Sequence, residues 1–133
     1  MTERAPDPTE VYARFGGEET FRALVAGFYR RVREDEVLAP MYPPEDWEGA
    51  EWRLAHFLMQ YWGGPTTYSE ARGHPMLRAR HSPFHVDAEA RTRWLTHMRA
   101  SLDELVIDPA LEAALWDYLR RAAFAMQNVP EGS

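Results

Sequence analysis

Apolar residues recur at helical spacing along most of this 133-residue chain, and no segment alternates apolar with polar residues as a half-buried strand does. The pairs Asp7-Pro8 and Asp108-Pro109 are typical helix starts, because aspartate can cap the first turn and proline fits the first helical position. The chain is therefore expected to be all-α. We predict helices over residues 8–15, 18–33, 47–62, 88–105 and 109–128.

The connections between these helices carry their own signals. Glycine tolerates the left-handed conformation that follows a helix, so Gly16-Gly17 and Gly63-Gly64 mark helix ends. Residues 35–44 contain three prolines, which forbid a long helix and predict a turn-rich corner. Residues 66–74 are polar and contain glycine, so we expect a loop there. Loops of that length often flank a binding site.

The composition limits the class of partner. Acidic residues number 21 and basic residues 15, for a formal charge of −6, which argues against nucleic acid or an anionic membrane as partner. Cysteine is absent, which excludes disulfides and thiolate ligands. No apolar run approaches the length of a membrane span. We expect a soluble cytoplasmic protein with one folded domain, residues 9–129, between tails at residues 1–8 and 130–133.

His81 is the candidate metal ligand. It lies at the end of a short predicted helical turn that opens with Pro75 and is stopped by Pro83. A single imidazole can hold a metal only if other ligands come from elsewhere, and a porphyrin brings four nitrogens, so haem is the first hypothesis. A capping or surface histidine is the alternative. Zinc shared with His85 is disfavoured, because Pro83 interrupts the helix that would align the two rings.

Short motifs follow one another in order between residues 11 and 128, among them Phe28-Tyr29, Asp35-Glu36-Val37-Leu38, Tyr42-Pro43, Gln60-Tyr61-Trp62-Gly63-Gly64-Pro65 and Leu77-Arg78-Ala79-Arg80-His81-Ser82-Pro83-Phe84. In this order they resemble the truncated haemoglobins of the second group, and in particular the oxygen-binding truncated haemoglobins of actinobacteria. The resemblance implies a truncated globin fold, a two-over-two helical sandwich around haem b (protohaem IX, with its iron). It also implies that His81 is the proximal iron ligand.

On the opposite, distal side of the haem, the resemblance implies three polar residues, Tyr29, Tyr42 and Trp94. Ala50 matches the position where ordinary globins often place a gating histidine. Two phenols and an indole agree with this role on chemical grounds, because a pocket that retains dioxygen needs hydrogen-bond donors within an apolar cavity. Core packing is the alternative role for Trp94, since tryptophan on the inner face of a helix is usually a packing residue.

The same resemblance and the chemistry of the cofactor predict which residues would hold haem. Arg80, and less directly Arg78, can pair with the propionates, and the Tyr61 hydroxyl can bond the same carboxylates. Exposed arginines with no such role are the alternative. The predicted apolar contacts are Leu54, Phe57, Leu77, Phe84 and Met126.

Three functions stay open on the sequence alone. One is redox chemistry, such as dioxygenation of nitric oxide or a peroxidase-like reaction, for which a separate reductase is needed because the chain has no nucleotide or flavin motif. Another is reversible binding of dioxygen and other diatomic ligands for storage or delivery. A third, from a different class, is a haem-free helical sensor or interaction domain. The sequence leaves the oligomeric state open, a homodimer included.

Overall fold

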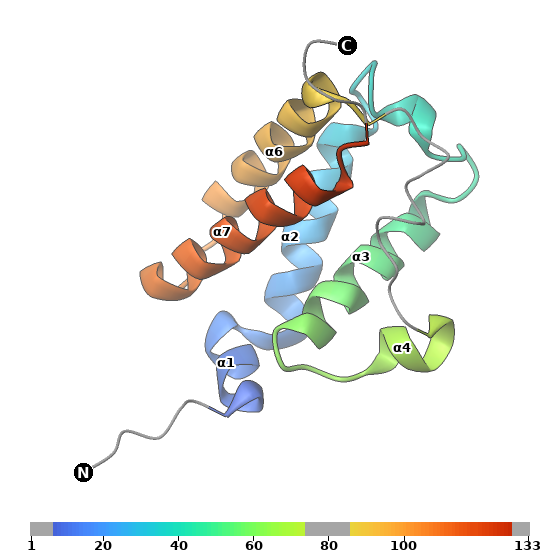
Figure 1. Ribbon diagram of the computed structural model, residues 1–133. Coiled ribbons are helices and arrows are strands. Elements are labelled where there is room, and N and C mark those ends of the chain that lie inside the picture. The colour runs from blue at the N-terminus through green and yellow to red at the C-terminus, as the bar shows by residue number, and fades with distance from the viewer. Residues whose placement is uncertain (1–6, 74–85, 129–133) are drawn as a thin grey trace.

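The computed structural model describes residues 7–73 and 86–128, and every regular element in these two ranges is helical (Figure 1). The prediction of an all-α chain is confirmed. His81 and its predicted neighbours Leu77, Arg78, Arg80 and Phe84 lie outside the described residues. The elements are α1 (Pro8–Phe15), α2 (Gly17–Val32), the 3-10 helix η1 (Ala39–Met41), α3 (Trp47–Tyr61), α4 (Thr67–Arg72), α6 (Ala88–Asp103) and α7 (Pro109–Met126).

The predicted capping residues start the helices. The carboxylates of Asp7, Asp87 and Asp108 accept hydrogen bonds from backbone N–H groups of the following turn at 2.8 to 2.9 Å. These bonds satisfy donors that a helix N-terminus otherwise leaves unpaired. At the other end of α1, Gly16 adopts φ 111°, a left-handed conformation that ends the helix and allows α2 to begin at the next residue.

The predicted loop over residues 66–74 is wrong in its central part, where α4 forms. Two tertiary contacts explain the difference. The Tyr68 side chain is buried and packs edge-on against Phe57, with ring centroids 5.7 Å apart. The Gln60 side chain accepts a hydrogen bond from the Ser69 backbone N–H at 3.0 Å and donates to the Ser69 hydroxyl at 2.7 Å. Packing against α3 thus overrides a polar composition with weak helical propensity.

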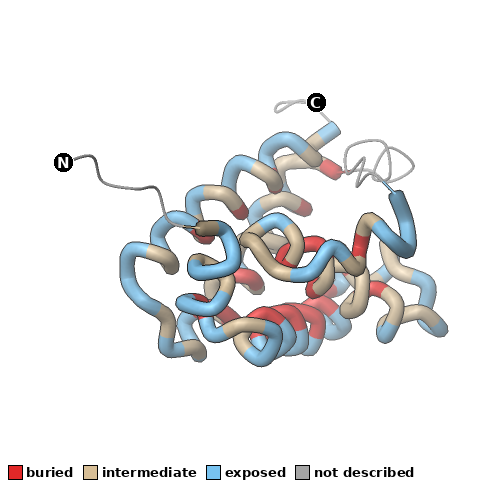
Figure 2. The backbone as a smooth tube through the Cα atoms, turned by 90° about the horizontal axis from the view of Figure 1, so that it is seen from below, coloured by how far each residue is buried: buried red, intermediate tan, exposed pale blue. Residues whose placement is uncertain are grey.

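The helices form two pairs. Helix α2 packs against α3 and also against α6, while α6 and α7 pack against each other and run side by side (Figure 1). Figure 2 shows the buried positions gathered where these helices face one another. This is the two-over-two arrangement that the resemblance implied. Within the two described ranges, no helix combines the length and the apolar character needed to cross a membrane.

Helices α2 and α6 approach closely because Gly27 has no side chain. A Cβ at Gly27 would lie 2.4 Å from the Ser101 hydroxyl oxygen. That buried hydroxyl instead donates a 2.6 Å hydrogen bond to the Leu24 carbonyl on α2. The close contact fixes α6 against α2, and with it the residues that α6 presents toward the interior.

Candidate functional site

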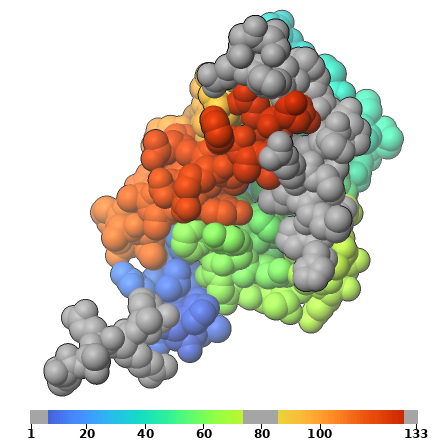
Figure 3. All heavy atoms as spheres, viewed as in Figure 1, coloured from blue at the N-terminus to red at the C-terminus, as the bar shows by residue number. Residues whose placement is uncertain are grey.

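A cavity of about 510 Å³ lies between the helices, with walls formed by α2, the corner that follows it, α3, α6 and α7. In the space-filling view, α7 adjoins α3 on the face of the molecule shown (Figure 3). The cavity brings together predicted residues that are far apart in the sequence. Those that line it are Tyr29, Tyr42, Ala50, Leu54, Phe57, Trp94 and Met126.

The three predicted donors lie on one aromatic network. The rings of Tyr29 and Tyr42 meet edge to face with centroids 5.5 Å apart. Phe28, which is fully buried, packs edge-on against both Tyr29 at 4.9 Å and Trp94 at 5.1 Å. Such edge-to-face pairs have preferred geometries, so the shared contact with Phe28 restricts how Tyr29 and Trp94 can turn. The Tyr29 and Trp94 rings are therefore held in place before any ligand enters.

Burial keeps both distal phenols protonated. It raises the pKa of Tyr29 well above its usual value, and proximity and hydrogen bonding to Tyr42 raise it further. Burial also raises the pKa of Tyr42, whereas the hydrogen bond with Tyr29 lowers it, as expected if Tyr29 donates and Tyr42 accepts. At neutral pH each hydroxyl therefore retains its proton, and the Tyr42 proton is available for a ligand in the cavity.

Trp47 packs against both Tyr29 and Tyr42, a contact that the sequence did not predict. Its ring stacks on Tyr42 at 5.1 Å and meets Tyr29 edge-on at 6.2 Å. The guanidinium of Arg33 lies over the same indole, 5.3 Å from its centroid. The spacing of α3 placed Trp47 on the inner face of that helix, but its contact with Tyr42 depends on the fold of residues 35–44.

A buried carboxylate joins the two elements that carry Tyr42 and Trp94. The Asp35 side chain, 3% exposed, accepts hydrogen bonds from the backbone N–H groups of Val37 and Leu38 at 2.8 and 2.9 Å. These bonds fix the corner that leads to Tyr42. The same carboxylate lies 2.6 Å from Nε2 of His97, one turn beyond Trp94 on α6.

Arg93, the neighbour of Trp94 in the chain, also donates to Asp35, at 3.3 Å. Burial alone would raise the pKa of the Asp35 carboxyl, but the hydrogen bonds from His97, Leu38 and Val37, with the charge of Arg93, lower it to about 2. Asp35 is thus ionised at neutral pH and holds the corner to α6. Sequence reasoning missed this link, because residues 35 and 97 meet only in the folded chain.

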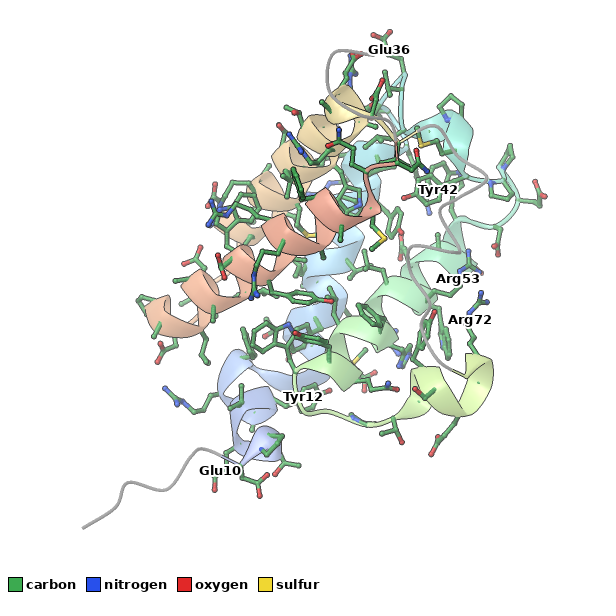
Figure 4. All side chains as sticks on the ribbon, viewed as in Figure 1. Glu10, Tyr12, Glu36, Tyr42, Arg53 and Arg72 are labelled. Atoms are coloured by element: carbon green, nitrogen blue, oxygen red, sulfur yellow. The ribbon has the colours of Figure 1, made fainter. Side chains whose placement is uncertain are left out.

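Charged residues other than the Asp35 group line the cavity itself. Arg53 and Asp46 both contribute to the lining, and Arg53 Nη2 donates to Asp46 Oδ2 at 2.9 Å. Arg72 and Arg91 line the cavity as well. Figure 4 shows Arg53 and Arg72 on the same side of the molecule as Tyr42. The seven-residue spacing of Asp46 and Arg53, two helical turns, was the only signal for this pair in the sequence.

Tyr61 is not among the residues that line the cavity. Its side chain is 53% exposed and stacks on Tyr118 with centroids 4.1 Å apart. Tyr118 does line the cavity, and burial and the proximity of Tyr61 raise its pKa to about 12. Beside this pair, the buried indole N–H of Trp62 has no hydrogen-bond partner within the described residues. Tyr61 thus lies behind the cavity lining, next to Tyr118 and, with ring centroids 6.2 Å apart, to Phe57.

The residue types of this cavity fit haem. Its volume lies within the range of small-molecule and cofactor sites, and most of its lining is apolar, as a porphyrin ring requires. The three predicted donors, Tyr29, Tyr42 and Trp94, all line this one cavity. Arg72 and Arg91, which also line the cavity, carry the positive charge that propionates need.

The comparisons with known proteins indicate the same cofactor as the residues of the cavity do. A model of the bacterial-like globin family matches residues 10–128. The chain is 39% identical over 115 residues to the group 2 truncated haemoglobin YjbI of Bacillus subtilis, covering 86% of each protein.

Solved structures give the same result. A thermostable haemoglobin of the actinobacterium Thermobifida fusca superposes with a TM-score of 0.88 at 60% identity, covering 91% of this chain and 98% of that one. A truncated oxygen-avid haemoglobin from Bacillus subtilis superposes with a TM-score of 0.83 at 36% identity, covering 92% and 100%.

Proposed function

The chain belongs to the bacterial-like globin family and, within it, to the group 2 truncated haemoglobins, and from this premise we propose that it binds dioxygen tightly, through a hydrogen-bonding network of Tyr29, Tyr42 and Trp94. The cofactor of the family is haem b, whose iron binds diatomic ligands. The chain's own contribution is the cavity and the donors, carried on packed aromatic rings.

The observation that carries the proposal is the convergence of three donors from three separate elements on one cavity. Tyr29 comes from α2, Tyr42 from the corner and Trp94 from α6. A hydrogen bond to a charged acceptor contributes about 1.5–3 kcal/mol, so each donor should slow ligand release by roughly tenfold or more. The oxygen-avid relative from Bacillus subtilis is consistent with such retention.

The opposite side of the haem rests on the resemblance. We propose His81 as the proximal iron ligand, with Leu77, Phe84 and Arg80 beside the cofactor. On the described side, Leu54, Phe57 and Met126 line the cavity and would contact the apolar ring. The Tyr61 hydroxyl can reach a propionate only at the edge of the cavity, next to Tyr118.

Tight retention suits redox chemistry better than oxygen delivery, because a carrier must release its ligand. Conversion of nitric oxide and dioxygen to nitrate consumes one electron, so the protein would draw that electron from a separate reductase. The three distal donors would hold the dioxygen in place while nitric oxide enters. Reversible storage remains the second reading of the same cavity.

Absorbance and stopped-flow measurements test the proposal. The purified protein should show a Soret band with one haem per chain, and the ferrous form should release dioxygen slowly. Replacing Tyr29, Tyr42 and Trp94 together with phenylalanine should accelerate that release by about a hundredfold or more, since the two direct charge-assisted bonds from Tyr42 and Trp94 are lost together with the Tyr29 hydroxyl that bonds Tyr42. A chain that takes up no haem, or a triple variant that releases dioxygen at the original rate, would refute the proposal. Nitrate formation under a chemical reductant separates the redox function from storage.

A further inference from the structure

The ion pair between Asp46 and Arg53 in the cavity wall has no part in the oxygen binding proposed above. Asp46 lies at the start of α3, Arg53 lies two turns later, and both line the cavity that holds Tyr29 and Tyr42. Their side chains are 43% and 33% exposed. A guanidinium in such a position keeps much of its electrostatic effect, because only part of its surroundings is water.

Gly49 makes room for this pair. A Cβ at that position would lie 2.1 Å from Asp46 Oδ1 and 2.8 Å from Arg53 Nη1. The Asp46 and Arg53 side chains therefore meet on the surface of α3 directly above Gly49. Because both contacts are to the ends of side chains, an alanine at position 49 would displace the pair without disturbing the helix, which alanine favours over glycine. The geometry of the pair can thus be changed while all charges are kept.

The charge of Arg53 acts on the distal phenols. Burial is the dominant influence and raises the pKa of both Tyr29 and Tyr42, and the positive charge of Arg53 opposes that rise at both hydroxyls. Arg91, another lining arginine, is directed elsewhere: its guanidinium lies over the Phe124 ring, 5.1 Å from the centroid. Among the described residues, Arg53 thus combines a place in the cavity lining with a positive charge that opposes the rise in pKa of both Tyr29 and Tyr42.

We propose that Arg53 makes the cavity favour anionic ligands of the iron over neutral ones, and that Asp46 limits this preference by pairing with the guanidinium. The inference rests on the proposed haem function and adds to it a residue that selects ligands by charge. A positive charge near the distal side stabilises a negative ligand by Coulomb attraction, whereas a neutral ligand gains little. Donors alone discriminate less, because they bond any ligand with an acceptor atom.

Azide and carbon monoxide are the test ligands, one anionic and one neutral at neutral pH. In the ferric protein, Arg53→Gln should raise the azide dissociation constant by about threefold to tenfold, the effect of removing one partly screened charge. In the ferrous protein, the same variant should change carbon monoxide affinity by less than about twofold. Arg53→Lys keeps the charge and should restore most of the azide affinity. The difference in azide affinity between the unmodified protein and Arg53→Gln should shrink as salt is added.

Asp46→Asn provides the opposite change and leaves Arg53 in place. It should tighten azide binding, because the guanidinium is no longer partly neutralised. Gly49→Ala should alter azide affinity with no change in total charge. The control is Arg22→Gln, which removes an arginine paired with Glu18 at the exposed start of α2, outside the cavity lining, and should leave azide binding unchanged.

The outcomes separate this inference from the proposed function. Haem content, measured first by the Soret band, tests the proposed function alone. With haem bound, azide affinity that is the same in Arg53→Gln as in the unmodified protein overturns the inference, as does weaker azide binding in Asp46→Asn. Equal losses of azide and carbon monoxide affinity also overturn it, because they would indicate a general change of the cavity. If Arg53→Gln retains no haem, azide titrations of Asp46→Asn and Gly49→Ala decide whether the inference holds.

Discussion

Replacing Asp35 with asparagine should weaken the fold and loosen the distal donors together. Four donors converge on this carboxylate: two backbone N–H groups of the corner, His97 and Arg93. Asparagine is nearly the same size and can still accept from the backbone, but it loses the negative charge that His97 and Arg93 share. The fold should therefore survive, with the corner that leads to Tyr42 held less firmly to α6.

The magnitude follows from the pKa. The Asp35 pKa falls from the ordinary 3.8 to about 2, and each unit is worth about 1.4 kcal/mol, so the ionised carboxylate stabilises the folded state by about 2 kcal/mol at neutral pH. Because the folded pKa is depressed, this stability is fully present above the unfolded pKa and is lost as the pH falls toward 2. About half of it should be gone by pH 3.

Urea unfolding between pH 7 and pH 3, on the unmodified protein and on Asp35→Asn, measures this contribution. The variant should be less stable by about 2 kcal/mol at pH 7, and the gap should narrow as the pH falls. Asp117→Asn is the matched control, since Asp117 is exposed and forms only surface ion pairs. Two stability curves that stay parallel down to pH 3 would show that the carboxylate is not held as described. Faster oxygen release from Asp35→Asn would show that the link also positions Tyr42 and Trp94.

Three further substitutions test individual residues that are proposed to act at the haem. Trp94→Phe keeps an aromatic ring and deletes the donor, so it should raise the oxygen release rate more than Tyr29→Phe or Tyr42→Phe alone; a stopped-flow rate within about twofold of the original would mean that the indole only packs. His81→Ala should sharply reduce haem retention, and an unchanged haem content with the original ferrous spectrum would exclude His81 as the ligand. Ala50→Gln places a bulky polar group in the cavity and should change ligand entry or ferric coordination, whereas unchanged kinetics and spectra would contradict its placement over the haem.

The parts of the fold that sequence reasoning predicted are those set by local chemistry. Aspartate caps, an N-terminal proline and a left-handed glycine act within a single turn, so Asp7, Asp108 and Gly16 located the helix ends closely. Helical spacing likewise placed Leu54, Phe57 and Met126 on inner faces. The segment that forms α4 could not be predicted in this way, because its helix depends on Gln60 and Phe57 from another element.

The candidate site also contains residues that the sequence predicted and residues that it did not. The resemblance supplied Tyr29, Tyr42 and Trp94, which the cavity brings together. Sequence reasoning missed Asp35, which fixes the corner that leads to Tyr42, and Arg53, whose charge acts on both tyrosines. Asp35 looks like an ordinary turn residue until His97 approaches it, and Arg53 looks like a surface arginine until the cavity is seen. Their roles depend on neighbours distant in the chain or on the shape of the interior, and a linear sequence displays neither.

The hydrogen bond from Ser101 to the Leu24 carbonyl has a consequence for the order in which the molecule forms. It joins positions 77 residues apart, where Gly27 lets α6 lie close against α2. During synthesis, the segment that becomes α1 to α4 leaves the ribosome well before α6 does, so the inner face of α2 stays uncovered until the C-terminal helices emerge. Contacts of such long range also slow the final folding step, because the intervening chain must first be closed into a loop. Haem could therefore find its complete cavity only after the last helix has been made.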